Sequence, residues 1–129
     1  MTLDEVFKEL TVFDDCRIMD NSEGTFSLES RVTERNINPY GTAHGGYLYT
    51  LSDTVAGVTA ATMGDYCVTL QGNINYVKPA EKDDVLLVTG KICHNGRKTK
   101  VIEVNIIDQN GSLICKSTFT MYSVGKISE

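Results

Sequence analysis

His44, Gly45, Gly46 and Asp53 are the residues whose types and spacing best suit a reactive site. The two glycines follow the histidine at the point where a helical pattern begins. The first turn of a helix offers backbone N–H groups without partners and a partial positive charge. These groups suit a phosphate, or a carbonyl oxygen that gains negative charge. Bare glycines would let such a ligand reach the backbone, but close packing of the helix against a sheet would also explain them.

Asp53 falls inside the predicted helix, where aspartate is unfavourable because it competes for backbone hydrogen bonds. It is either a solvent-facing polar position or a functional carboxylate. Leu51 and Val55 belong to or border the apolar stripe of this helix, so we expect the carboxylate to be partly desolvated. A carboxylate in such surroundings suits the role of base or nucleophile.

The nine-residue spacing of His44 and Asp53 keeps them from sharing one small reactive centre in one chain. It corresponds to about 2.5 turns and a rise of roughly 13 Å, so the side chains lie on opposite faces. Two chains related by a two-fold axis, with antiparallel helices side by side, would bring Asp53 of one near His44 and Gly45 of the other. Such a homodimer would contain two identical sites.

Periodicity along the chain predicts an α+β fold, in which a curved antiparallel sheet wraps around one long central helix. A lone amphipathic helix needs a sheet to cover it, and 129 residues are the usual size of one domain, over residues 1–129. Helices are predicted at residues 3–10 and 43–63. Strands are predicted at residues 12–19, 25–32, 66–77, 83–94, 98–108 and 113–123, with Asn-Gly turns after two of them.

The long helix has a glycine, Gly57, in its interior, among the small residues Ala56, Ala60 and Ala61. A glycine there costs roughly 1 kcal/mol relative to alanine. We expect close approach of another backbone or of the sheet to compensate for this cost. Gly64 is expected to act as the C-cap that ends the helix.

Composition indicates a soluble globular protein, with 41% apolar and 22% charged residues. The chain has no apolar run near the ~20 residues that a membrane span needs and no signal-peptide pattern, so we expect a cytoplasmic protein without a membrane partner. A net charge of −5 argues against nucleic-acid binding. The four cysteines lack zinc-site spacing, so we expect reduced thiols, with no metal site and no disulfide.

Basic residues concentrate in one segment. Between residues 78 and 100 there are six of the twelve basic residues and three acidic ones. Solvated strand ends and a hairpin tip would explain this segment, and so would a local anion site. His94, beside the turn at Asn95 and Gly96, is expected to be an exposed loop residue.

The segment NPYGTAHGGYLYTLSDTVAG, residues 38–57, resembles the signature of the hot-dog-fold acyl-CoA thioesterases of the phenylacetate-degradation, or PaaI-like, type. The segments NINYVKPA and HNGRKTKVIEVNIIDQNG resemble a strand and a hairpin of the same family, so the resemblance covers about residues 25–123. The residues that match the signature position by position are Asn38, Gly41, His44, Gly45, Gly46 and Asp53.

The resemblance implies hydrolysis of an acyl-CoA thioester without a cofactor. Gly45 would offer its backbone N–H to the thioester carbonyl, and Asn38 would orient or bind the attacking water or the thioester. Asp53 of the other chain would act as general base or nucleophile. His44 would position the thioester, and Thr69 would partner the aspartate through its hydroxyl.

The resemblance also implies where CoA and the acyl group bind, and a homotetramer built from two dimers. CoA would run along the sheet edge to the basic hairpin, whose side chains would hold its phosphates. The acyl pocket would suit an aromatic or a short to medium aliphatic group. The candidate residues are Arg97, Lys98 and Lys100 for the phosphates, Gly46 and Asn73 for substrate or CoA, and Tyr40, Tyr47 and Met63 for the acyl pocket.

Two other functions compete with hydrolysis. The first is a non-catalytic acyl-CoA or fatty-acyl binding module on the same fold, although a binder has no need of a carboxylate such as Asp53 beside a thioester. The second is an enoyl-CoA hydratase or dehydratase of the same superfamily. Those enzymes usually place an acid and a histidine close together on one chain, which the spacing of His44 and Asp53 does not do.

Overall fold

The computed structural model describes residues 2–7 and 15–128. The predicted helical residues 8–10 and strand residues 12–14 lie outside this range. The described residues form a short helix, a single 3-10 turn, a long helix and a set of strands. In chain order these elements are α1 (Leu3–Phe7), β1 (Cys16–Ser22), β2 (Thr25–Arg31), η2 (Glu34–Asn36), α2 (Gly45–Ala61), β3 (Asp65–Tyr76), β4 (Val85–Asn95), β5 (Thr99–Ile107) and β6 (Leu113–Lys126).

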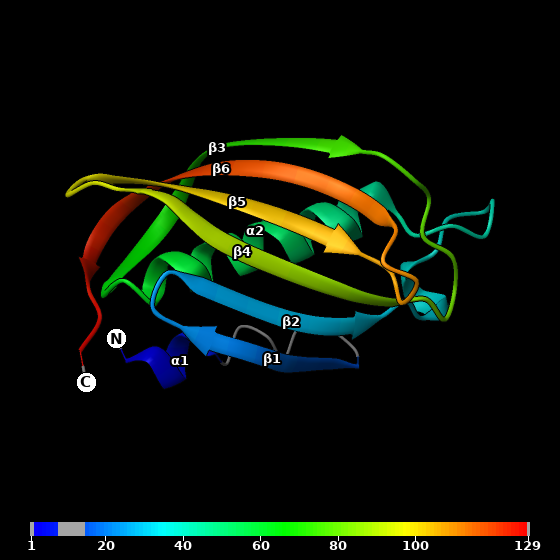
Figure 1. The fold of residues 1–129 in the computed structure, drawn as a ribbon, viewed down its shortest axis with the longest axis horizontal. Coiled ribbons are helices and arrows are strands. Elements are labelled where there is room, and N and C mark those ends of the chain that lie inside the picture. Colours follow the sequence, from blue (N-terminus) through cyan, green and yellow to red (C-terminus); the bar gives the residue numbers. More distant parts are fainter. Residues whose placement is uncertain (1, 8–14, 129) are drawn as a thin grey trace.

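The strands form one antiparallel sheet in the order β1-β2-β4-β5-β6-β3, which curves around α2 (Figure 1). The predicted sheet around a central helix is therefore confirmed. Since α2 connects β2 to β3, the chain crosses the concave side of the sheet and β3 begins at the edge opposite β1. The long strand β3 consequently pairs with β6 alone among the described strands.

Alternation along the strands places the core between the sheet and α2. On β5, Ile102, Val104 and Ile106 are fully buried, whereas the residues between them are half-buried on the outer face. Leu51 and Val55 of α2 are also fully buried. Burying one such side chain contributes about 1.5–3 kcal/mol, so the contact of α2 with the sheet holds the helix in place.

The close approach of helix and sheet occurs at a strand glycine and not at Gly57. A Cβ added at Gly90 of β4 would lie 2.9 Å from Cγ1 of Val55 and would overlap Thr59, whereas one added at Gly57 would meet only Cε of Met121, at 3.7 Å. The latter is an ordinary contact, so close packing within one chain does not explain Gly57. The C-cap of α2 is Thr62 and not Gly64 as expected; Gly64 lies two residues further on, in the turn after the helix, where it has φ +102°.

Two further features of the chain are the character of its helices with respect to a membrane and the state of its cysteines. No helix in residues 2–7 and 15–128 combines the length and the apolar character that a bilayer span requires. All four cysteines are free thiols. Burial raises the pKa of Cys115 to about 11, so this thiol is protonated at neutral pH.

Candidate active site

The loop that leads into α2 is organised by the side chain of Asn38. Its Oδ1 accepts hydrogen bonds from the backbone N–H groups of Tyr40 and Thr42, at 2.9 and 3.1 Å, and its Nδ2 donates to Oγ1 of Thr42 at 2.9 Å. Bonds of this kind from asparagine stabilise a tight turn. The amide that we expected to bind water or the thioester is therefore engaged in holding this loop.

The first turn of α2 is bare. His44 precedes it with φ −59° and ψ 136°, its side chain caps no backbone group, and its own N–H donates to the Asn36 carbonyl at 2.8 Å. Gly45 and Gly46 are exposed, and their N–H groups find no acceptor within the described part of the chain. A Cβ at Gly46 would meet nothing within 4 Å. Packing therefore does not explain Gly46, and the helix start is open to a ligand.

Tyr76, at the end of β3, lies against Gly45. Its hydroxyl donates to the Gly45 carbonyl at 2.8 Å, and burial raises the pKa of this hydroxyl. Together with Lys78 and Pro79 it lines a hollow of about 240 Å³ beside the helix start. Tyr76 was not among the candidate site residues predicted from the sequence. The available signal was the aromatic residue before the proline in NINYVKPA.

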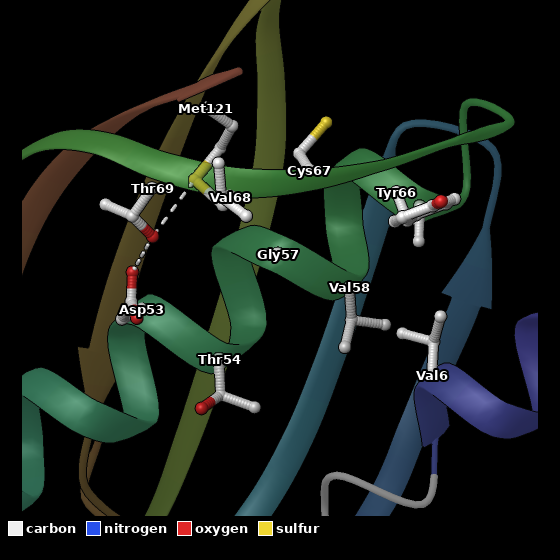
Figure 2. A pocket seen from close by; sticks show the side chains of 11 residues that line it. Val6, Asp53, Thr54, Gly57, Val58, Tyr66, Cys67, Val68, Thr69 and Met121 are labelled. Carbon is white, nitrogen blue, oxygen red and sulfur yellow. Dashed lines mark hydrogen bonds between the residues drawn. The ribbon is translucent and has the colours of Figure 1, made fainter. Parts of the chain in front are cut away.

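Asp53 projects from the third turn of α2 toward β3, where it meets Thr69 (Figure 2). The Thr69 hydroxyl donates to Oδ1 of Asp53 at 2.5 Å, within the range of short, charge-assisted bonds. Oγ1 of Thr69 also lies 3.6 Å from the sulfur of Met121. Within residues 2–7 and 15–128, Thr69 is the hydrogen-bond partner of this carboxylate, and it binds Oδ1. The second oxygen, Oδ2, therefore remains available for chemistry.

A cavity of about 330 Å³ begins at this carboxylate and lies between α2, β3 and α1 (Figure 2). None of the three residues expected to form an acyl pocket lines it. Tyr40 is 90% exposed on the preceding loop, and the Tyr47 hydroxyl shares a 2.9 Å hydrogen bond with Ser30 on β2. The residues that line it are Val6, Asp53, Thr54, Gly57, Val58, Ala61, Tyr66, Cys67, Val68, Thr69 and Met121.

The helix start and the carboxylate remain apart within one chain. Gly45 and Asp53 are both on α2, and eight residues of helix separate them by about 12 Å. Each chain consequently presents a bare helix start with Tyr76 and, two turns away, a carboxylate with a cavity.

Lys100 corrects our expectation for the basic hairpin. It is 3% exposed, with Nζ 3.1 Å from Oδ2 of Asp65, and it donates to Asn95 and to the Gly96 carbonyl. Lys126 approaches the other Asp65 oxygen at 2.9 Å, and these two lysines, Lys126 foremost, lower the pKa of Asp65. The prediction that Lys100 holds a CoA phosphate is wrong because its ammonium group is buried against Asp65.

Arg97 and Lys98 are exposed in the β4–β5 turn, as is His94 just before it. This turn projects from the end of the molecule where β3 begins, far from the start of α2 (Figure 1). Asn73 pairs with Thr118 on β6 and is exposed, while its neighbour Gly72 faces Tyr49 of α2. Asn73 therefore lies on the outer face of the sheet, away from the cavity.

Comparison with known proteins identifies the fold and the family. Residues 40–115 match the Thioesterase superfamily. A hypothetical thioesterase from Streptococcus pneumoniae TIGR4, solved with coenzyme A, is 38% identical with a TM-score of 0.94, over 98% of this chain and 100% of that one. Structures of that thioesterase with an aspartate or a threonine replaced by alanine are also known.

Two further relatives point to the same family. The protein smu.793 from Streptococcus mutans UA159, bound to acetyl-CoA, is 37% identical with a TM-score of 0.88, over 90% of this chain and 94% of that one. Acyl-coenzyme A thioesterase PaaI from Escherichia coli K12 is 28% identical over 71% of this chain and 66% of its own length. The chain therefore belongs to the thioesterase superfamily, as a PaaI-like thioester hydrolase with the hot-dog fold.

Proposed function

We propose that this protein is an acyl-CoA thioesterase, which hydrolyses an acyl-CoA to the free acid and CoA. The observation that carries the proposal is the Asp53 carboxylate, held by Thr69 at the mouth of a largely apolar cavity. This arrangement suits cleavage of a bond adjacent to an apolar acyl group. The CoA and acetyl-CoA in the two streptococcal relatives support CoA as the thiol.

Asp53 acts either as general base or as nucleophile. As base, Oδ2 takes a proton from water while the water oxygen bonds to the thioester carbon, and the carbonyl electron pair moves onto oxygen. The C–S bond then breaks, and the CoA thiolate leaves and takes up the proton. As nucleophile, the carboxylate attacks the thioester carbon, the C–S bond breaks and the CoA thiolate leaves, which gives an anhydride. Water then hydrolyses this anhydride to the free acid and the regenerated Asp53 carboxylate, and the proton released goes to the thiolate. In both routes Thr69 fixes the carboxylate, and the Gly45 N–H stabilises the oxyanion.

We further propose that each site combines Asp53 of one chain with Gly45 and His44 of a second. Strand β3 leaves its outer edge unpaired among the described strands, and an open edge favours pairing with another chain. Val68 and Leu70 of this strand are 53% and 63% exposed. Antiparallel pairing of two β3 edges would place two α2 helices antiparallel. Two such dimers would form the homotetramer that the family resemblance implies.

In this dimer the chain that supplies Asp53 also supplies the exposed Arg97 and Lys98 of the β4–β5 turn. The carboxylate and the turn both lie away from the start of their own α2. For the turn this follows from Lys100 of the same hairpin, which contacts Asp65 at the start of β3, after the helix has ended. The positive charges of Arg97 and Lys98 would bind the phosphates of CoA, and the strength of this binding would depend on ionic strength.

The test is Asp53→Asn, assayed by thiol release from acetyl-, octanoyl- and phenylacetyl-CoA. Asparagine keeps an oxygen for the Thr69 hydroxyl but cannot accept a proton, so we expect kcat to fall about 10²–10⁴-fold. Full activity of a folded variant would contradict the assigned role. If the unaltered protein binds these ligands in calorimetry and hydrolyses none of them, the non-catalytic binding module is the correct function.

A further inference from the structure

The cavity beside Asp53 is elongated along one face of α2. Asp53, Thr54, Gly57, Val58 and Ala61 line it, and these residues follow one another at the one- and three-residue intervals of a single helical face. From the first to the last is about 12 Å of helix. Figure 2 shows Asp53 with Thr69 at one end, and Val58 facing Val6 of α1 toward the other, near Tyr66.

Beyond the carboxylate the cavity wall carries no charged side chain. Aliphatic residues and the Met121 thioether form most of this part of the wall. Its polar groups are the hydroxyls of Thr54 and Tyr66 and the thiol of Cys67, whose pKa is raised by burial. An uncharged, elongated wall favours an apolar, unbranched group over a charged or bulky one. A volume of about 330 Å³ holds roughly ten non-hydrogen atoms at the packing of a liquid.

Gly57 lies midway along this wall. Its position in the helix interior is unfavourable for glycine, and the space around it would accept a Cβ, whose nearest neighbour would be Cε of Met121 at 3.7 Å. Neither the helix nor its packing against the sheet therefore requires glycine here. What the missing side chain does provide is open volume between the carboxylate and the end of the cavity at Val6.

We propose that Gly57 is a specificity-determining residue, whose missing side chain keeps the cavity continuous from Asp53 to Val6 so that it takes an unbranched, medium-length acyl chain. This inference rests on the proposed thioesterase function and narrows its substrate class. The thioester lies at Asp53, and the hydrocarbon chain passes Gly57 with its methyl end toward Val6. A larger side chain at position 57 divides the cavity and leaves only the part next to Asp53.

The experiment compares Gly57→Leu with the matched control Gly57→Ala, using acetyl-, octanoyl- and phenylacetyl-CoA. We expect the unaltered protein to prefer octanoyl-CoA. In Gly57→Leu we expect the ratio of kcat/KM for octanoyl-CoA to kcat/KM for acetyl-CoA to fall at least about 10-fold. Gly57→Ala adds one methyl group and should keep most of the preference for octanoyl-CoA.

An unchanged ratio of octanoyl- to acetyl-CoA turnover in folded Gly57→Leu overturns the inference. If that variant does not fold, Val6→Ala at the far end replaces it, and the ratio of decanoyl- to octanoyl-CoA turnover must rise for the inference to stand. A preference of the unaltered protein for acetyl- or phenylacetyl-CoA leaves the thioesterase function intact and overturns the chain-length inference. Absence of turnover with every acyl-CoA overturns both.

Discussion

At the scale of single residues, Gly45 offers a way to remove a backbone donor without disturbing its helix. It occupies the first helical position, where proline is well tolerated because the N–H has no partner inside the helix. The preceding His44, at φ −59° and ψ 136°, already has the extended conformation that a following proline demands. Gly45→Pro should therefore fold normally and lower kcat about 10²–10³-fold, the usual effect of losing one oxyanion donor.

Gly45→Ala is the matched control for this variant. It places a Cβ 3.3 Å from the Tyr76 ring, as proline also does, but it keeps the N–H. Circular dichroism checks the helix, and steady-state kinetics with octanoyl-CoA separates kcat from KM. If alanine lowers kcat as much as proline does, the contact with Tyr76 matters and the N–H is not the oxyanion donor.

The sequence was informative about residues that lie close together in the chain and less so about their distant partners. Gly45, Gly46 and Asp53 stand out locally because glycines at a helix start and an aspartate within a helix break propensity rules. Tyr76 is 31 residues from Gly45, and no local pattern announces their contact. Lys100 was misjudged because a lysine beside a turn looks exposed unless its partner, Asp65, is known.

At the scale of elements, the periodicity of α2 and of the strands was readable because each buries one face. Residues 102–106 alternate strictly, and the Asn-Gly turns mark the strand ends. The order of strands was not readable, because 36 residues of chain separate β3 from its partner β6, and the neighbours of β3 depend on how α2 crosses the sheet. The cavity next to Gly57 depends on that same crossing.

The buried Asp65–Lys100 pair fastens the β4–β5 hairpin to the start of β3. Asp65→Asn removes the charge that neutralises Lys100, and breaking a buried pair in this way costs about 3–5 kcal/mol. We expect the free energy of unfolding in urea at pH 7 to fall by that order. The double variant Asp65→Asn/Lys100→Met should recover part of the loss, because no buried charge remains unpaired. A loss below about 1 kcal/mol in the single variant would contradict the assigned role.

The same pair predicts that the free energy of unfolding depends on pH. The pKa of Asp65 is lowered in the folded state, mainly by Lys126 and then by Lys100, so the folded protein binds its proton less readily than the unfolded chain. The stabilisation is complete above the unfolded pKa of about 3.9 and is lost as the pH falls through the lower, folded pKa. The pKa of Asp108 is lowered as well, because the backbone N–H groups of Ser112 and Asn110 donate to its carboxylate. The contribution of Asp65 is therefore isolated by measuring the free energy of unfolding against pH for both wild type and Asp65→Asn and taking the difference.

At the scale of the whole molecule, the helix start at Gly45 and the carboxylate of Asp53 lie apart along α2, and we propose that each is half of a site. In the proposed dimer, pairing at the open β3 edge brings a second chain to complete each half. The net charge of −5 opposes non-specific attraction of polyanions, so in this proposal the exposed Arg97 and Lys98 would act only locally, on the CoA phosphates. A shared site would explain why residues 38–53 hold both features although helical geometry separates them.

Mixing two inactive variants tests this sharing directly. Asp53→Asn and Gly45→Pro chains are unfolded together in urea at equal amounts and refolded, so that subunits combine at random. If each site takes Asp53 from one chain and Gly45 from another, about a quarter of the sites are intact, in a dimer or in a tetramer of dimers. Each variant refolded alone is the control and should remain inactive. If every site lies within one chain, each carries one lesion and the mixture stays as inactive as its parents, which would refute the shared site.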